Sequence, residues 1–224
     1  MSFIDKLEGI ASSALERFKP FNPQTLNDEL ALKTDWQPMK KGGANFATHS
    51  LKQTTDRKLE YKPTLMAYLF PAIFISAFSV GGYVAAMQFS DKFGNLAYLI
   101  GGAFVLVPIG LGIFLLKTYM KPKVFDTNLG LFYKGKLPVN YHNADPSNKL
   151  CRLDEVYALQ LLRYISTSTS SDSNTTRTYY ELNMVLNDTY RINIASNTDK
   201  YRILKEANQI ASTIDVPVWD AISR

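Results

Sequence analysis

Two long stretches without a charged side chain constrain the fold of this sequence more than any other feature. They run from Pro63 to Ser90 and from Phe93 to Leu116, and only Asp91 and Lys92 separate them. A helix needs roughly 20 apolar residues to cross the hydrocarbon core of a bilayer, and each stretch is longer than that. The sequence therefore predicts a transmembrane helical hairpin in residues 63–116, with spans at about 64–89 and 94–116.

Basic residues flank the predicted hairpin on both sides, whereas its turn holds only Lys92 beside Asp91. Cytoplasmic flanks collect Lys and Arg, so both termini should be cytoplasmic and the turn outside. Since these charges lie near the membrane ends and are not interleaved with aromatics, they favour lipid headgroups over nucleic acid as a partner. The candidate headgroup contacts are Lys58, Lys62, Lys117, Lys121, Lys123, Lys134 and Lys136.

Small residues recur along both spans, where a second helix could approach closely. The candidate helix-packing residues are Ala77, Gly81, Ala85, Ala97 and Gly101. They fit a hairpin that packs on itself, and they also fit an oligomer or a partner helix. Neither span contains Asp, Glu, Lys, Arg or His. Because intramembrane ionisable groups mark ion and proton routes, their absence argues against a transporter or pump.

The part of the chain before the hairpin divides into three segments. Apolar residues at spacings of three and four predict an amphipathic helix in residues 1–20. That helix could dock on this protein, on a partner or on the membrane surface. Its candidate partner-binding residues are Phe3, Leu7, Ile10, Ala14 and Phe18. Turn signals indicate a linker in 21–44, with a short helical turn near 26–32. Residues 45–62 predict a strand pair that joins a sheet supplied by the C-terminal region.

After the hairpin, residues 117–224 change to the period-two pattern of strands. Strands are expected at 124–126, 129–133, 153–165, 178–186 and 191–195. The run 166–176 is almost entirely Ser, Thr, Asn and Asp, and is interpreted as a mobile hairpin loop. An amphipathic helix is expected at 198–214. The fold class is therefore a membrane α+β protein, in which a transmembrane hairpin accompanies an antiparallel strand domain closed by a C-terminal amphipathic helix.

Four short motifs accompany this order of elements: Trp36-x-Pro38, Gly42-Gly43-x-Asn45-Phe46-x-Thr48-His49, Tyr180-Glu181-Leu182-Asn183 and Val216-Pro217-Val218-Trp219-Asp220. With these motifs the chain resembles a group of bacterial inner-membrane proteins that combine a two-helix hairpin with a pleckstrin-homology-like cytoplasmic domain. The group has no assigned activity, so the resemblance implies a fold and a multi-pass location in the cytoplasmic membrane, and no mechanism.

The sequence shows no pattern typical of a catalytic, cofactor or metal site. His49 and His142 are the only histidines, Cys151 is the only cysteine, and no short ligand spacing joins them. Asp154 and Glu155 are adjacent, and adjacent strand residues point to opposite faces. We therefore expect a non-enzymatic membrane adaptor or accessory subunit without a cofactor, which binds a protein partner in a hetero-complex or homo-oligomer. The alternatives are an anionic-lipid-sensing module and, more weakly, a channel or transporter subunit.

Overall fold

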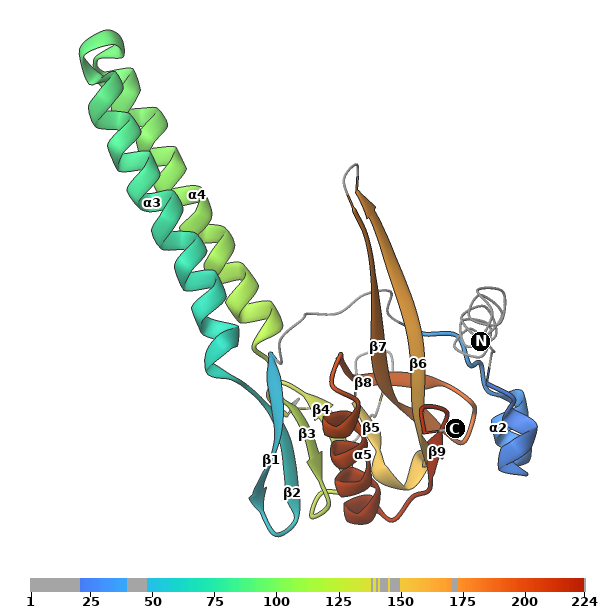
Figure 1. Ribbon diagram of the computed structural model, residues 1–224. Helices are drawn as coiled ribbons and strands as arrows, with labels where there is room; N and C mark the ends of the chain where they lie inside the picture. Colours follow the sequence, from blue (N-terminus) through green and yellow to red (C-terminus); the bar gives the residue numbers. More distant parts are fainter. Residues whose placement is uncertain are drawn as a thin grey trace, which may run out of the picture.

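The computed structural model describes residues 21–39, 48–137, 139, 141, 145, 150–170 and 173–223. Within them, two β-sheets and one amphipathic helix form a strand domain, from which a pair of long helices projects (Figure 1). The long apolar helices and the antiparallel sheets that the sequence predicts are both present. The predicted helix 1–20 and the part of the predicted strand pair that precedes Thr48 lie outside the described residues.

Sheet A is formed by strands from both sides of the helix pair. Its order is β1-β2-β3-β4-β5, with antiparallel neighbours throughout. The strands are β1 (His49–Thr55), β2 (Lys58–Pro63), β3 (Lys123–Asp126), β4 (Leu131–Lys134) and β5 (Leu150–Arg152). Because β2 pairs directly with β3, the whole helix pair is inserted between two neighbouring strands of one sheet.

Sheet B has the order β8-β7-β6-β9. Its strands are β6 (Val156–Ser170), β7 (Ser173–Leu186), β8 (Arg191–Asn197) and β9 (Val218–Asp220), and a short 3-10 turn, η3 (Leu153–Glu155), leads into β6. The first three strands pair antiparallel, and β9 returns parallel to β6. Asp154 and Glu155 therefore lie in this turn and not in a strand, contrary to the sequence-based expectation.

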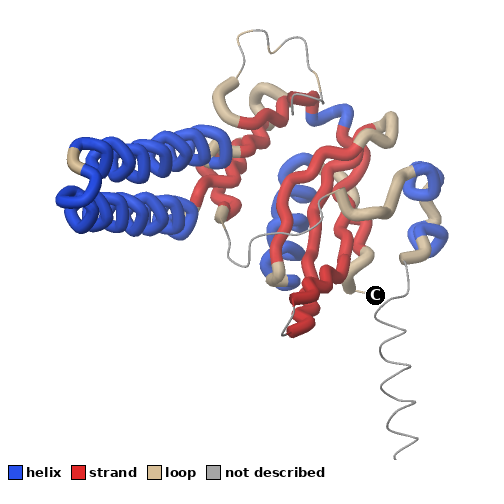
Figure 2. Tube along the Cα trace, turned by 90° about the horizontal axis from the view of Figure 1, so that it is seen from above, coloured by secondary structure: helices blue, strands red, loops and turns tan. Residues whose placement is uncertain are grey.

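The helix α5 (Lys200–Ile214) packs between the sheets and completes the core. Asp199 caps its N-terminus, because the Asp199 carboxylate accepts a hydrogen bond from the Arg202 N–H. Its buried residues are Ile203, Glu206, Ala207, Ile210 and Ala211. The apolar ones join Phe125 and Phe132 of sheet A and Leu182 and Met184 of sheet B in one cluster. Sheet B thus turns one face to α5 and the opposite face to the segment that contains α2 (Glu29–Lys33) (Figure 2).

Strands β6 and β7 continue far beyond the body of the domain as a two-stranded ribbon (Figure 1). Their pairing extends to Ser170 and Ser173, so the interpretation of 166–176 as a mobile loop is wrong. The reason is that strand pairing satisfies main-chain groups and does not require apolar side chains. Thr is also β-branched and favours extended backbone. A polar composition excludes a core position but not a strand.

The helix pair consists of α3 (Leu65–Phe93) and α4 (Asn95–Tyr119), joined by Gly94 alone. Gly94 has φ +55° and ψ −133°, a conformation that only glycine adopts readily. Both helices are long and apolar enough to cross a membrane, and only 12% of the most apolar window of α3 and 22% of that of α4 are buried. The pair is therefore not part of the core of the strand domain, and it extends away from the sheets (Figures 1 and 2).

Small residues form the contact between α3 and α4. Among the predicted packing residues, Gly101 and Ala97 of α4 are buried in this contact, whereas Ala77 and Gly81 of α3 are exposed and Ala85 is half-buried. Their neighbours Gly82 and Ala86 take the place of the predicted row on α3. The row of α3 that α4 contacts is therefore one position away from the predicted row. Gly81 and Gly82 are adjacent and equally small, so composition alone does not select between their faces.

A valine at Gly101 should disturb the helix pair, whereas a valine at the next residue should not. A Cβ at Gly101 would lie 2.5 Å from Ala86 Cβ and 2.9 Å from the Gly82 carbonyl oxygen, and nothing lies within 4 Å of a Cβ at Gly102. We expect Gly101→Val to destabilise the pair by about 1–3 kcal/mol through overpacking. Gly102→Val adds the same side chain to the same helix and should leave the unfolding midpoint in detergent almost unchanged. Equal effects at the two positions would contradict this packing.

Candidate functional site

The segment 21–39, which the sequence suggests is a linker, lies against the outer face of sheet B. It contains η1 (Pro23–Leu26) and α2, and local capping explains both. The Asn22 side chain accepts from the Gln24 N–H, with Pro23 at the first helical position. The Asp28 carboxylate accepts from the N–H groups of Leu30 (2.9 Å) and Ala31 (3.2 Å). We call residues 28–39 the strap.

Apolar packing and one carboxylate hold the segment from Leu26 to Trp36 against sheet B. Leu26, Leu30, Ala31 and Trp36 pack on Ala158, Val185 and Trp219 of sheet B. The Trp36 and Trp219 rings have centroids 5.9 Å apart. Asp28 also accepts hydrogen bonds from Trp219 Nε1 (3.2 Å) and the Tyr157 hydroxyl (3.3 Å). The charge of that carboxylate raises the pKa of the Tyr157 phenol above its ordinary value.

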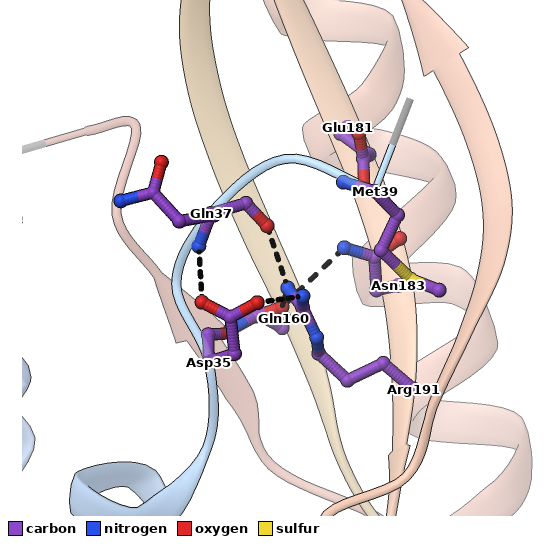
Figure 3. Close-up of polar contacts among 7 residues, drawn as sticks. All are labelled: Asp35, Gln37, Met39, Gln160, Glu181, Asn183 and Arg191. Carbon is purple, nitrogen blue, oxygen red and sulfur yellow. Dashed lines mark hydrogen bonds and ion pairs between the residues drawn. The ribbon is translucent and has the colours of Figure 1, made fainter. Parts of the chain in front are cut away.

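A row of side-chain amides crosses three strands beneath the second half of the strap. Asn193 on β8 donates to Asn183 on β7 (3.1 Å), and Asn183 donates to Gln160 on β6 (3.3 Å). Gln160 then donates to the main-chain carbonyl of Asp35 (3.0 Å). Gln160 and Asn183 are completely buried and Asn193 is 6% exposed. Each side-chain amide donates a hydrogen bond to the next, and Gln160 at the end of the row donates to the strap. Figure 3 shows Asn183, Gln160 and Asp35 of this arrangement.

Two charged side chains complete this contact. The Arg191 guanidinium forms an ion pair with Asp35 (2.6 Å) and donates to the Gln37 carbonyl oxygen (2.8 Å) and to Gln160 (3.2 Å). The completely buried Glu181 accepts the Met39 N–H (2.9 Å). The face of sheet B that these side chains form, with Gln160, Glu181, Asn183, Arg191 and Asn193, is called the strap site here.

The strap site contacts the main chain of alternate strap residues. The groups it binds are the Asp35 carbonyl, the Gln37 carbonyl and the Met39 N–H (Figure 3). The contacts in this half that depend on strap side chains are the ion pair of Asp35 and the ring packing of Trp36. A buried polar group is stable only when it is hydrogen-bonded. The arrangement can therefore bind a short stretch of polypeptide largely through its backbone.

A second polar cluster connects α5 to the strands beside the helix pair. The Tyr61 hydroxyl on β2 donates to Glu206 (2.9 Å), and Arg202 donates to the other oxygen of that carboxylate (2.9 Å). Arg202 also donates to the main-chain carbonyl of His49 on β1 (2.5 Å). Burial and the Glu206 charge raise the pKa of the Tyr61 phenol well above its ordinary value. The phenol is thus a hydrogen-bond donor at neutral pH, and this cluster is a structural link.

The predicted lipid-contact lysines do not form one group. Lys117, Lys121 and Lys136 are exposed near the bases of the helices. Lys62 and Lys58 both pair with Glu60, but Lys58 lies at the far end of β2 from α3. Lys123 points inward, because its ammonium donates to the carbonyls of Asn193 and Ile194 and so joins sheet A to β8.

Lys134 lies on β4 opposite Lys123. Lys58 and Lys123 therefore do not belong to a basic surface at the helix bases. Lys58 lies at the end of β2 that is far from the helices, and the Lys123 ammonium is used in the contact between the two sheets. The candidate partner-binding residues Phe3, Leu7, Ile10, Ala14 and Phe18 all lie outside the described residues.

The Cys151 side chain lies in surroundings that disfavour a reactive thiol. Burial raises the pKa of the Cys151 thiol to about 12, with a smaller contribution from Glu155. The thiolate that a nucleophile or metal ligand requires is therefore disfavoured. His49 Nδ1 lies 3.0 Å from the Thr48 hydroxyl, and His142 lies outside the described residues. In the described part of the chain, no group of three or more His, Cys, Asp or Glu side chains could hold a metal ion.

The strap site was not predicted from the sequence. The alternation in β7 places Glu181, Asn183 and Val185 opposite the apolar face of Leu182 and Met184, and a polar face normally indicates solvent. The signal that could have revealed the site is that this face also carries the apolar Val185 beside Glu181 and Asn183. A face in contact with solvent is normally polar throughout. No protein-family model, curated protein or solved structure matches the chain.

Replacement of Arg191 tests how much the strap site contributes to stability. Arg191→Met should lower the free energy of unfolding by about 1–3 kcal/mol, because Gln160 and two strap groups lose a buried donor. Arg152 offers a matched control, since its ion pair with Asp154 is equally short (2.7 Å) but its side chain is 60% exposed, against 10% for Arg191. Arg152→Met should leave the urea midpoint almost unchanged, because an exposed ion pair contributes little to stability. The reverse order of effects would show that the strap contact is marginal.

Proposed function

We propose that this chain is a non-enzymatic integral membrane adaptor that anchors a strand domain at the cytoplasmic face of a bacterial inner membrane and binds a protein partner there. The observation that carries the proposal is the helix pair α3 and α4, whose apolar side chains are exposed along its length. Soluble proteins rarely expose apolar patches of such extent. A bilayer would cover these side chains.

The connections at the base of the pair support a fixed orientation of the domain. Only Thr64 separates β2 from α3, and its N–H donates to the Thr48 carbonyl (2.9 Å). On the return, Met120 to Pro122 separate α4 from β3. Both connections are too short to act as flexible linkers, so an inserted pair would hold sheet A close to the headgroups. Lysines on both flanks favour cytoplasmic termini for this arrangement.

We also propose that the strand domain is pleckstrin-homology-like. The support is its element order, in which two sheets made mainly of antiparallel strands are followed by a C-terminal helix whose apolar side packs against both sheets. The insertion lies between adjacent strands, where a hairpin can be accommodated without changing the order of the sheet. Since the strap site binds backbone groups and its described surroundings contain no reactive cluster, a binding role is favoured over catalysis.

Insertion predicts that a charge in the middle of α4 is costly. Leu106 is 69% exposed near the centre of the helix, so in water Leu106→Lys would have almost no effect. In a bilayer the same change should cost about 2.5–3.5 kcal/mol. We expect the native chain to remain in membranes after alkaline carbonate extraction, and Leu106→Lys to reduce the inserted amount severalfold. Leu32→Lys changes a residue of α2 that is 53% exposed and lies outside the pair of long helices, and should have no effect on insertion.

The adaptor role is tested on the same membranes. Purification in mild detergent should recover a second protein in a stoichiometric amount, and an outside-specific reporter should remain silent at either terminus. A carbonate-soluble chain would overturn the membrane anchor. A strictly solitary monomer would overturn the adaptor role and leave the anchor intact.

A lipid-sensing role is the second candidate, and the exposed Lys117, Lys121 and Lys136 near the helix bases favour it. Each such lysine contributes about 1 kcal/mol with an anionic leaflet. The triple change to Ser should then reduce the anionic lipid that co-purifies with the full chain, measured by lipid mass spectrometry. Changing Lys33, Lys52 and Lys205 to Ser removes the same charge elsewhere and provides the control. Equal lipid content in both variants would exclude specific headgroup binding.

A further inference from the structure

We propose that the strap site is a peptide-binding site that the chain's own strap occupies, and that the ligand is a short segment of a partner protein with an acidic residue directly followed by an aromatic one. The inference rests on the proposed adaptor function, because it names the surface at which the partner is bound. Its chemistry is defined by the occupant, in which Asp35 pairs with Arg191 and Trp36 packs beside Trp219.

The polar composition of the strap site favours a role in binding a peptide segment over a role as a face that only has to be covered. A sheet face that only needs a cover is most stable when it is apolar, as it is at Ala158 and Val185. The second half of the same face instead buries Gln160, Glu181 and Asn183 completely. Burial of such groups is costly unless each is hydrogen-bonded. Their partners are in part main-chain atoms of another segment, which is the usual chemistry of peptide recognition.

The contacts also define which parts of a ligand matter. Carbonyl groups at a first and a third residue and an N–H at a fifth are bound, as at Asp35, Gln37 and Met39. The fourth position is occupied by Pro38, which has no N–H. The Asp35 side chain accepts from the Gln37 N–H (2.9 Å) and bends the segment. Side-chain selectivity is thus confined to the acidic and aromatic positions.

The strap can be displaced because part of it remains accessible. The Asp35 side chain of the strap is 60% exposed, whereas the Arg191 side chain of the site is only 10% exposed. The carboxylate of the occupant is therefore close to solvent, and the guanidinium of the site is held in the sheet face. Leu32 and Met39 are 53% and 42% exposed. A tethered segment has an effective concentration on the order of millimolar, so a free competitor at micromolar concentration does not displace it until the strap is weakened.

The test uses the full-length chain in zwitterionic detergent and a fluorescein-labelled synthetic peptide with the sequence of residues 31–39. Fluorescence anisotropy measures peptide binding to the native chain and to the Asp35→Asn/Trp36→Ala variant, whose strap loses its ion pair and its ring contact. We expect the variant to bind the peptide at least about tenfold more tightly, since the competent fraction of the site rises. A peptide with Lys in place of Asp35 should not bind.

A matched pair of changes locates the binding. In the weakened-strap variant, Arg191→Ala should reduce peptide affinity about tenfold or more through the lost charge-assisted bonds, and Arg152→Ala should not change it. Hydrogen exchange of the Met39 amide reports whether the strap has left Glu181, and thermal unfolding checks that each variant is folded. If the double change unfolds the chain, Asp35→Asn alone replaces it, with a proportionally smaller gain.

Two outcomes would overturn the proposal. If the Met39 amide exchanges rapidly and the peptide still does not bind, the site does not accept a free segment. If that amide stays protected in every strap variant, the strap is a permanent cover. Both outcomes differ from a failure of the adaptor role, which would be seen as the absence of a co-purifying partner from the native chain.

Discussion

The antiparallel pairing of β2 with β3 is the interaction on which the rest of the arrangement depends. It joins Tyr61 to Lys123 and Lys58 to Asp126 across the whole helix pair. Because these strands are neighbours, α3 and α4 must start and end side by side, and a single Gly94 at the far end is enough to reverse the chain. The entropy of closing a long insertion rises only logarithmically with its length, so the sheet tolerates the insertion.

The two sheets are joined by contacts that also reach the helix bases. Lys123 begins β3, directly after the connection from α4, and its ammonium binds carbonyl groups of β8. On the other arm, Tyr61 contacts Glu206 of α5, two residues before the end of β2. Both entry points of the helix pair are therefore fixed to the core of the strand domain. A displacement of α5 would be transmitted to the base of α3 through hydrogen bonds and not through a flexible linker.

The sequence predicted those elements whose signal is local. Hydropathy indicated α3 and α4, and period-two patterns indicated most strands. The stripe in 198–214 corresponds to α5 at Lys200–Ile214. The errors concern features that neighbours decide. Gly81 and Gly82 are the same residue type, and only the position of α4 decides that Gly82 forms the contact between the two helices. The Ser- and Thr-rich run pairs as a ribbon because its main chain finds a partner strand.

The strap site was hidden for a related reason. The alternation around Leu182 correctly separates Glu181 and Asn183 from the core, but a second layer over that face is supplied by residues 28–39, more than a hundred positions away in sequence. Turn signals such as Gln37-Pro38 indicate an irregular segment and do not indicate where it lies. Lysines were misjudged similarly, since nothing local distinguishes exposed Lys121 from Lys123, which joins the sheets.

The energetics of the strap site favour exchange of occupants over opening. If the strap left without a replacement, Glu181 would lose the Met39 N–H and Gln160 would lose the Asp35 carbonyl, while Val185 and Trp219 would lose their apolar cover. Each lost bond to a buried group costs about 1–3 kcal/mol. A competing segment that brings the same backbone groups removes most of that cost. Under the proposed binding role, a partner would therefore bind by replacing the strap and not by finding an empty site.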